Sequence, residues 1–518
     1  MANIYIIGVG GTGMRCIESF IHLCAIGMFD NTTVHMLALD TDKDNGNFKR
    51  LSELVGYYRK INGDEPKADT LFSADLKYYQ FSPDYSERKN SLTFNDITKK
   101  GFLQNQNPID ENTKTHESDL LDLFIRPEVG QMDLRHGYRA QTQMGSMLMF
   151  HAIQEEAYKS KTAEHSSDLR KFLSALNEGT GHNIFVFGSV FGGTGASTIP
   201  IIPEAFNSAA QILFGADRDI IQGNHFGSVV LTNYFTFDMP DINNEVVAKA
   251  DKFALNSQAA LNFYFKDNTI NKVYKRLYLI GRENMRVLDA KGTGGKEQCN
   301  PVDYIELMSA FAAYDFFKKC SSSDPEKAFE ENNENKFVFR SLNEGSKYLT
   351  FENFVASEDA QLFKKKLGIM TAASYLNSVN DYFDNLRKDE VVYDENILKN
   401  QLKPYFKLFG LSIDDNENII SGWLDQIFKS AISDNYTEGA FFNPDLFKCQ
   451  TRKELKSFKI NKELYNLEDA PKFNVGLFGS SFDTVRTTFS TTKSTRTNSI
   501  DAMLERTYLT LRKLYFNE

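Results

Sequence analysis

The stretch FGSVFGGTGAS, residues 187–197, decides the fold. It follows an apolar run at 184–187 that we predict to be a buried strand, and it leads into a segment typical of a helix. Glycines in a turn between a strand and a helix let the backbone approach a phosphate closely, and the N–H groups and dipole of the helix favour negative charge. Pro200 and Pro203 suit such a helix because first-turn N–H groups need no intrahelical partner. The stretch predicts a phosphate-binding loop, and a glycine turn that serves only packing is the alternative.

A second glycine-rich turn, GVGGTG at residues 8–13, lies between a predicted strand at 4–7 and a predicted helix at 14–25. It satisfies the dinucleotide fingerprint GxGxxG, and the next predicted strand, 34–39, ends in Asp40-Thr41-Asp42. Alone, this segment favours a dehydrogenase-like Rossmann domain, with a tight turn that binds nothing as the alternative. A Rossmann domain has no use for a second phosphate turn far downstream, whereas a di- or triphosphate held between two helix N-termini does.

The remaining apolar runs place both loops in an α/β domain. Strands are predicted at 4–7, 34–39, 184–187, 228–234 and 276–280. Helices are predicted between them, among them one after Gly145 and one at 246–265. Strands separated by helices favour a Rossmann-like, mainly parallel sheet with helices on both faces. From 43 to about 132 the chain is polar and irregular, which predicts a surface insertion.

The character of the chain changes after a helix predicted at 301–320. We expect a nucleotide-binding domain at 1–320 and a C-terminal, mostly helical domain at 321–518. The Ser/Thr-rich segment 484–499 is typical of a surface hairpin or loop. The last predicted helix carries five apolar residues on one face and should dock on the body or on a partner. These residues are Ile500, Met503, Leu504, Leu511 and Leu514.

Composition excludes several classes of protein. The 518 residues are 41% hydrophobic and 25% charged, as expected for a soluble chain with more than one domain. A net charge of −10 argues against sequence-independent binding of nucleic acid. Five scattered cysteines without CxxC spacing indicate neither a disulfide framework nor a zinc site, and they favour a reducing cytoplasm. The N-terminus reads as a buried strand and not as a signal peptide, and no apolar run is long enough to span a bilayer.

The two loops resemble those of the tubulin/FtsZ superfamily, whose signature is GGGTG(S/T)G. The likeness is closest to bacterial tubulin-like proteins, which combine a GVGGTG start with an FGGTGA-type loop, and it covers residues 1–320 in order. The resemblance implies a tubulin/FtsZ-type GTPase domain that binds GTP or GDP with Mg²⁺. It implies that the nucleotide contacts Gly8, Gly10, Gly11, Thr12 and Gly13; Asp40 and Asp42; Arg139, Ala140 and Gln141; Gly192, Gly193, Thr194, Gly195, Ala196 and Ser197; Asp238; and Asn300, Asp303 and Tyr304.

Some of these residues take specific roles by resemblance. The segment 137–145 is similar to the loop that senses the terminal phosphate, where Arg139 either donates a charge-assisted bond or is a solvated loop arginine. Asp238 stands in the place of the ribose-binding acid. Asn300 or Asp303 would read the guanine edge and Tyr304 would stack on the base. The ordinary alternative, which is compatible with these roles, is a helix start with Asn300 as N-cap and a proline at the first position.

The chain also departs from the family pattern. Phe191 replaces a glycine, Ala196-Ser197 replaces Ser/Thr-Gly, and the segment 281–283 lacks the usual guanine-binding asparagine. Guanine is therefore expected from the resemblance alone. No NxDxxD follows the central helix to complete hydrolysis, so the catalytic residue is unknown. Glu352 is a candidate stand-in, although a solvated surface glutamate fits that residue better.

Three functions follow as expectations. The first is a cytoplasmic GTP-binding protein that self-associates head-to-tail into filaments, with hydrolysis at the subunit interface and Mg²⁺ held by phosphates and water without direct protein ligands. The second is a non-hydrolysing, nucleotide-gated scaffold whose C-terminal region recruits a protein partner. The third is an NAD(P)-dependent oxidoreductase that uses the loop at 8–13, with Asp40 or Asp42 on the ribose.

Overall fold

The computed structural model describes most of the N-terminal two thirds of the chain and part of the remainder. The described residues are 3–83, 134, 138, 142–161, 166–236, 250–282, 285–288, 296, 300–330, 336–342, 353–379, 401–413, 419–432, 487–496 and 499–516.

The centre of the fold is a parallel sheet. Within the described residues it has seven strands in the order β3-β2-β1-β4-β5-β7-β9, and every neighbouring pair is parallel. The strands are β1 (Ile4–Val9), β2 (Thr33–Leu39), β3 (Asp75–Phe81), β4 (Asn183–Ser189), β5 (His225–Leu231), β7 (Tyr274–Arg282) and β9 (Phe337–Leu342). Because β1 is central and β4 follows it on the other side, the direction in which strands are added reverses between these two strands. In open α/β sheets, ligands bind at such a switch point.

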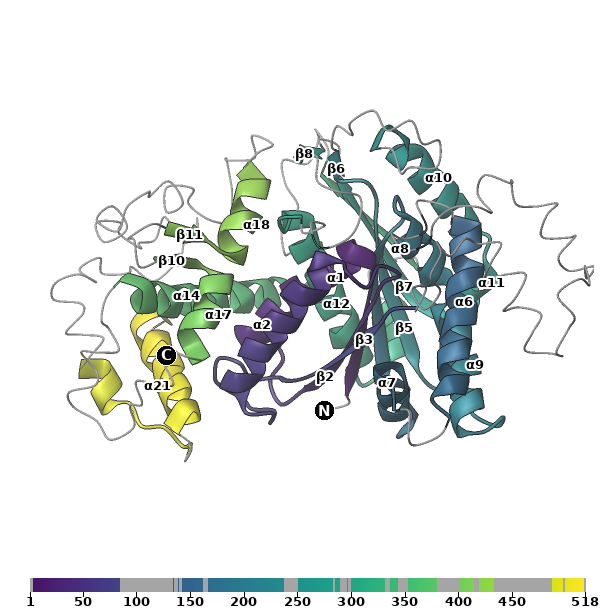
Figure 1. Cartoon of the computed structure of the whole chain (residues 1–518). Coiled ribbons are helices and arrows are strands. Elements are labelled where there is room, and N and C mark those ends of the chain that lie inside the picture. Colours follow the sequence, from purple (N-terminus) through teal and green to yellow (C-terminus); the bar gives the residue numbers. More distant parts are fainter. Residues whose placement is uncertain are drawn as a thin grey trace, which may run out of the picture.

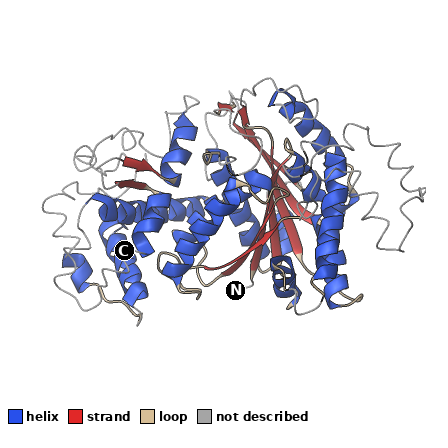
Figure 2. Cartoon of the chain, viewed as in Figure 1, coloured by secondary structure: helices blue, strands red, loops and turns tan. Residues whose placement is uncertain are grey.

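Helices cover both faces of the sheet (Figures 1 and 2). On one face lie α1 (Gly10–Ala25), α2 (Gly46–Asn62) and α12 (Tyr304–Cys320). On the other face lie α6 (Thr142–Lys159), α7 (Asp168–Asn177), α8 (Gly193–Thr198) and α9 (Ile202–Phe214). The remaining N-terminal elements are β6 (Phe235–Thr236), α10 (Phe253–Tyr264), α11 (Asn268–Lys272), β8 (Arg286–Val287) and α13 (Pro325–Glu330).

The alternation of side chains along β1 explains this layering. Ile4 and Ile6 belong to the core shared with α1 and α12, whereas Tyr5, Ile7 and Val9 belong to the core shared with α6, α7 and α9. Successive side chains of a strand point to opposite faces, so a strand that is apolar at every position must be covered on both sides. The α/β class and the parallel sheet predicted from the sequence are confirmed.

A further layer of C-terminal elements lies outside α1 and α2 (Figure 1). It comprises α14 (Ser357–Val379), α17 (Lys403–Phe409), β10 (Leu411–Ile413), β11 (Ile419–Ser421), α18 (Trp423–Ile432) and α21 (Ser499–Phe516). Trp423 donates to Ser19 Oγ (3.1 Å), and the ring of His22 contacts the hydroxyl of Tyr405 (2.8 Å). The apolar face predicted for the last helix is buried in this core, as expected.

The expected insertion from residue 43 is wrong over its first part. Residues Gly46–Asn62 form α2 and residues Asp75–Phe81 form β3, an outer strand of the sheet. The side chain of Asn45 caps α2 by accepting from the N–H of Asn47 (2.9 Å), and Gly63 ends the helix at φ +75°. Both signals are present in the sequence. The rest of the expected insertion, 84–132, lies outside the described residues.

Other boundaries also need correction. The strand predicted at 228–234 is β5, which ends at Leu231 and frees Tyr234 for a buried contact described below. The helix predicted at 246–265 is described only from 250 onward, as a 3-10 turn followed by α10. Residues 487–491 are helical, although a surface hairpin or loop was expected at 484–499. Strand β9 lies beyond the expected boundary at 320 and yet pairs with β7 in the central sheet.

Candidate functional site

The two predicted loops meet at one edge of the sheet. Strands β1 and β4 are parallel neighbours, with Gly8 paired to Phe187, so the turns that follow them emerge side by side. Gly10 has a φ of +71°, which favours glycine. A Cβ on Gly10 would lie 3.6 Å from Thr194 Cβ and 3.9 Å from the backbone nitrogen of Gly195. The loops at 8–13 and 192–197 therefore lie so close together that one added methyl group on Gly10 would touch Thr194.

Glycine is required beneath both loops by close packing. A Cβ on Gly13 would lie 2.5 Å from the carbonyl oxygen of Phe187 and 2.8 Å from the carbonyl carbon of Gly8. A Cβ on Gly195 would lie 2.8 Å from the backbone nitrogen of Ser189 and would overlap its carbonyl oxygen. The obstacles are backbone atoms, which cannot rotate away. Helices α1 and α8 thus start pressed against the carboxyl ends of the central strands.

Neither helix start is neutralised by its own residues. The N-cap of α1 is Val9 and that of α8 is Gly192, and these side chains cannot accept a hydrogen bond. The first turns contain no acidic residue. The first four N–H groups of a helix have no intrahelical partner, and the helix dipole places positive potential there. Two such ends in contact form an environment suited to an anion.

The loop after β2 borders the first glycine loop. The carboxylate of Asp40 accepts from the N–H of Thr41 (2.7 Å) and from Asn45 Nδ2 (2.8 Å). Burial, followed by the nearby charge of Asp42, raises the pKa of Asp40 to about 7, and the hydrogen bonds oppose that rise. Asp42 is also buried and accepts from the N–H of Asp44 (3.0 Å). Both predicted acids therefore lie at this edge, anchored in their own turn.

Helix α6 packs against the second glycine loop. Ser146 Oγ donates to the carbonyl oxygen of Ser197 (2.6 Å), and a Cβ on Gly145 would lie 2.7 Å from Ser197 Oγ. Ser197 in turn donates to the carbonyl of Thr194 (3.0 Å), and Tyr264 donates to the carbonyl of Ala196 (2.8 Å). The side chains of Ala196 and Ser197 are buried, so these two predicted residues support the loop from below.

The start of α12 differs from the expected helix start. Asp303, and not Asn300, is the N-cap: it accepts from the N–H of Ile305 (3.1 Å), and Glu306 Oε2 accepts from the N–H of Asp303 (2.9 Å). This capping box places the first helical residue at Tyr304, three residues later than expected. Arg282 Nη1 lies 3.2 Å from the Asp303 carboxylate, which is therefore already engaged by a cap and a cation.

The contacts described for Asn300 and Tyr304 involve their backbone atoms. Asn300 is half-buried, and its carbonyl oxygen accepts from Arg50 Nη1 (3.4 Å). The ring of Tyr304 is half-buried beside the core, and its N–H donates to Ser430 Oγ of α18 (2.7 Å). Their predicted base contacts stay predictions.

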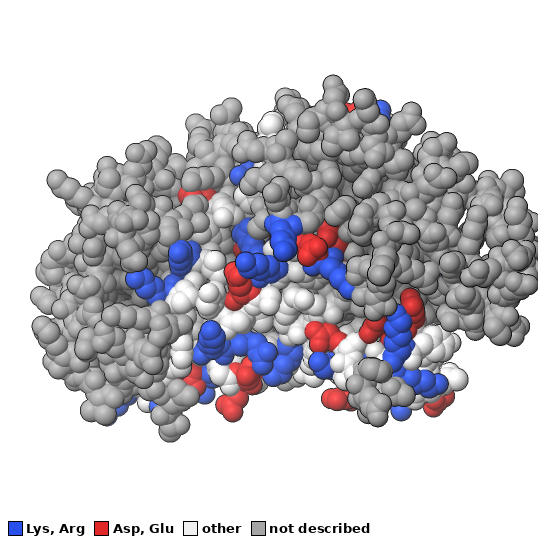
Figure 3. All heavy atoms as spheres, in the orientation of Figure 1, with Lys and Arg blue, Asp and Glu red and all other residues white. Residues whose placement is uncertain are grey.

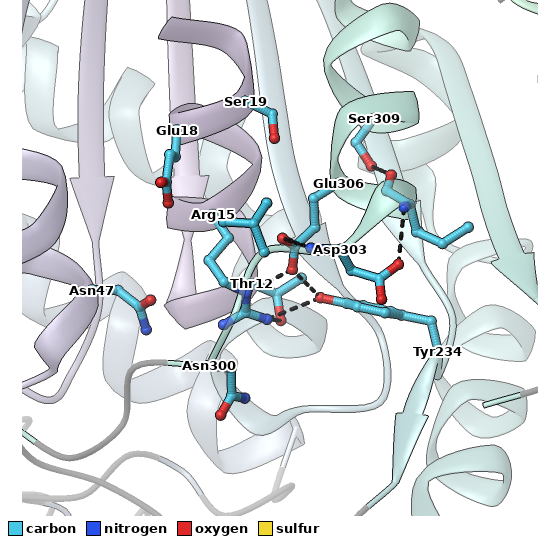
Figure 4. Close-up of polar contacts among 12 residues, drawn as sticks. Thr12, Arg15, Glu18, Ser19, Asn47, Tyr234, Asn300, Asp303, Glu306 and Ser309 are labelled. Atoms are coloured by element: carbon cyan, nitrogen blue, oxygen red, sulfur yellow. Dashed lines mark hydrogen bonds and ion pairs between the residues drawn. The ribbon is translucent and has the colours of Figure 1, made fainter. Parts of the chain in front are cut away.

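A buried polar network that the sequence did not indicate joins the first loop to α12 (Figure 4). Arg15 Nε donates to Glu306 Oε1 (2.6 Å), while its Nη2 donates to the hydroxyl of Tyr234 (2.9 Å) and to Thr12 Oγ1 (3.3 Å). Tyr234 donates to the same carboxylate oxygen (2.5 Å). Arg15 is 3% exposed and Glu306 is fully buried. Arg15 and Thr12 come from α1, Tyr234 from the segment between β5 and β6, and Glu306 from α12.

Electrostatics keep this arginine charged. Burial opposes the charge of Arg15, but Glu306 and Tyr234 together raise its pKa above the ordinary value. Burial raises the pKa of Glu306, and the adjacent guanidinium offsets part of that rise. Removing one partner of such a pair leaves an uncompensated buried charge, which typically costs about 3–5 kcal/mol. The network therefore fixes the position of α1 against α12.

The structure does not describe the remaining predicted site residues. Arg139, Ala140, Gln141, Asp238 and Glu352 lie outside the described residues. Among the residues that are described, no cluster of three or more His, Cys, Asp or Glu side chains is suited to a metal ion. No described helix is both long and apolar enough to cross a membrane.

Two other surface features lack the properties of a binding site. Described Lys and Arg side chains are interspersed with Asp and Glu on the face in Figure 3, so the described part of that face has no continuous basic stripe for a nucleic acid backbone. A cleft of about 740 Å³ lies between the C-terminal half of α12, β9 and the start of α14. Its lysines are paired with its acids, Lys319 with Asp315 (3.4 Å) and Lys318 with Asp359 (3.3 Å). The glycine loops are therefore the better candidate.

The chain has no match among protein-family models and none among curated proteins. Its function is therefore inferred from the arrangement of its own residues.

Proposed function

We propose that this chain is a GTP-binding protein of the tubulin/FtsZ type whose nucleotide phosphates are held between the loops at 8–13 and 192–197. The observation that carries the proposal is the closeness of the two loops, each of which opens a helix without a side-chain cap at neighbouring carboxyl ends of parallel strands. Two converging helix starts supply N–H donors and positive potential from two sides. The loop motifs and their order along the chain resemble the family and add support.

The residues present fit a nucleotide with Mg²⁺ in part. Backbone N–H groups of both loops would hold the phosphates, and no acidic side chain in either first turn would repel them. The metal would supply charge neutralisation on phosphate oxygens, held by those oxygens and by water. Guanine is the base that the resemblance implies.

Self-association is the second part of the proposal. In proteins that this chain resembles, the nucleotide lies at the contact between stacked subunits. We therefore expect GTP to promote a head-to-tail contact, which is heterologous and can propagate as a filament. A partner of the C-terminal region and a cytoplasmic location belong to the same proposal, and the free, buried Cys16, Cys24 and Cys320 are compatible with a reducing compartment.

Two rivals remain, each with its own support. The strand order β3-β2-β1-β4-β5-β7 is also that of dinucleotide-binding domains, and Asp40 follows β2 where such domains bind ribose. This favours an NAD(P)-dependent oxidoreductase as the second candidate. A non-hydrolysing scaffold is the third, and the sequence supports it because NxDxxD does not follow the central helix.

The experiment is a titration of the full chain with fluorescent GTP, ATP and NADH, each with and without Mg²⁺. The proposal expects the tightest binding for GTP, and preferential binding of NADH would replace it with the oxidoreductase. Sedimentation with GTP and Mg²⁺ then tests self-association, and an unchanged sedimentation profile counts against it. Release of inorganic phosphate separates a GTPase from a scaffold.

A further inference from the structure

One nitrogen of the Arg15 guanidinium, Nη1, takes no part in the buried polar network. Nε and Nη2 of Arg15 donate to Glu306, Tyr234 and Thr12. Within the described part of the chain, Nη1 makes no hydrogen bond. Figure 4 shows this nitrogen directed away from Tyr234, on the side where Asn47 lies. Nη1 is not among the fully enclosed polar atoms that lack a partner, so it reaches the surface beside the loop, where an added oxygen could accept from it.

Two amide nitrogens converge on the same place. Around the position that a Cβ on Gly11 would take lie Asn47 Nδ2 at 3.0 Å, Asn45 Nδ2 at 3.5 Å and Arg15 Nη1 at 3.7 Å. Asn45 Nδ2 also donates to Asp40 Oδ2 (2.8 Å) and Asn47 Nδ2 to Asn45 Oδ1 (2.8 Å), so these two amides line the place beside Gly11, and Arg15 Nη1 is the cationic donor there. Gly11 is the one residue of α1 that is not buried. Because Gly11 has no side chain, an oxygen atom of a ligand could occupy the place beside it, and any larger residue at position 11 would block that place.

The cluster is held rigidly. Asn45 is fixed by its bonds to Asp40 and to the N–H of Asn47, and Arg15 is fixed by Glu306 at 2.6 Å. Rigid, partly desolvated donors bind a charged oxygen more strongly than mobile surface lysines do, because less side-chain freedom is lost.

We propose that Arg15 forms a second anion-binding subsite beside Gly11, lined by Asn45 and Asn47, and is the fixed cation of the nucleotide site. The ligand group is an oxygen of the phosphate chain. This inference rests on the proposed function and deepens it: the charge that a lysine supplies in other phosphate loops comes here from the second turn of α1. Glu306 is a positioning residue that aims the guanidinium.

The test compares Glu306→Gln with the double variant Arg15→Met/Glu306→Gln in the full chain. Removing Arg15 alone would leave the Glu306 charge buried and unpaired, so the effect of the arginine is measured in the Glu306→Gln background. We expect the double variant to bind fluorescent GTP roughly 10- to 100-fold more weakly than Glu306→Gln, as for loss of a charge-assisted bond. Guanosine, which lacks phosphates, should bind both variants equally, and pyrophosphate should compete more weakly in the double variant.

A matched control uses a distant ion pair. Lys67 Nζ lies 2.5 Å from Asp501 Oδ1; Lys67 follows the C-terminal end of α2, and Asp501 lies in α21. Asp501→Asn and Lys67→Met/Asp501→Asn should bind GTP equally. Should the Arg15→Met double variant not fold, Arg15→Lys/Glu306→Gln replaces it. We expect this variant to lose about 3- to 30-fold in GTP affinity, because a lysine has a single nitrogen and cannot reproduce the planar set of guanidinium donors.

The outcomes separate the two proposals. Binding of GTP by the wild-type chain with equal affinities for Glu306→Gln and the double variant overturns the subsite and leaves the proposed function standing. An equal loss of guanosine and GTP affinity also overturns it, because Arg15 would then shape the pocket without contacting phosphate. No binding of any nucleotide by the wild-type chain removes both.

Discussion

Replacement of Gly13 by alanine should destabilise the fold although it improves the helix. Gly13 lies in α1, where alanine is favoured over glycine by about 0.8–1 kcal/mol. Its added Cβ would meet Phe187 O at 2.5 Å, Gly8 C at 2.8 Å and Gly8 Cα at 3.1 Å. Overpacking of this kind costs about 1–3 kcal/mol, and three backbone obstacles place Gly13→Ala near the upper end. The net loss should be about 2 kcal/mol.

Gly56→Ala is the matched control. Gly56 lies within α2, and a Cβ there would have nothing within 4 Å. The same helix preference then acts alone and should stabilise the chain by about 0.5–1 kcal/mol. Urea unfolding followed by circular dichroism measures both variants, which should differ by roughly 3 kcal/mol in the free energy of unfolding. If both variants shift the transition in the same direction and by the same amount, the claim that backbone packing holds the two loops together is refuted.

Three further outcomes are expected. Burial lowers the pKa of His35 to about 4, whereas the unfolded histidine titrates near 6.5, so stability should fall as pH drops from 6.5 to 4, by at most about 3 kcal/mol; urea unfolding of His35→Phe should show a weaker pH dependence. The carboxyl carbon of Asp40 should titrate by NMR near pH 7, because burial and Asp42 raise its pKa, and a midpoint near 4 would contradict this. Tyr234→Phe should lower the free energy of unfolding by about 1.5–3 kcal/mol, since its hydroxyl bonds to two buried charged groups, and a loss below 0.5 kcal/mol would show that Arg15 and Glu306 do not depend on it.

The fold could be predicted where strands are apolar on both faces. Strands β1, β2, β4 and β7 each contain an apolar run, such as Met36–Leu39 in β2 and Leu277–Ile280 in β7, because helices cover them on two sides. Strand β3 escaped detection since an outer strand needs less burial, and Lys77 and Gln80 interrupt its pattern. Helix α2 was missed although Leu51, Leu54 and Tyr58 recur at helical spacing between its cap and Gly63.

The site could be predicted only where it is local. Each glycine loop is one short stretch that begins a helix, so its chemistry can be read in place. The link between Arg15 and Glu306 joins residues 291 positions apart, and nothing in either segment identifies the other. The start of α12 was misplaced because Asn300-Pro301 imitates a helix start, while the Asp303/Glu306 capping box three residues on was the stronger signal.

The burial of α1 has a consequence for synthesis of the chain. Every residue of this helix except Gly11 is buried, and its outer side is covered by aromatic residues such as Trp423, which bonds to Ser19 across 404 positions of sequence. At about 5–20 residues per second, a ribosome needs roughly 20 to 80 seconds to deliver that cover. During this interval the apolar helix α1 has left the ribosome but the segment that covers it has not. The nascent polypeptide should therefore depend on chaperones, and truncation before residue 423 should yield an insoluble product.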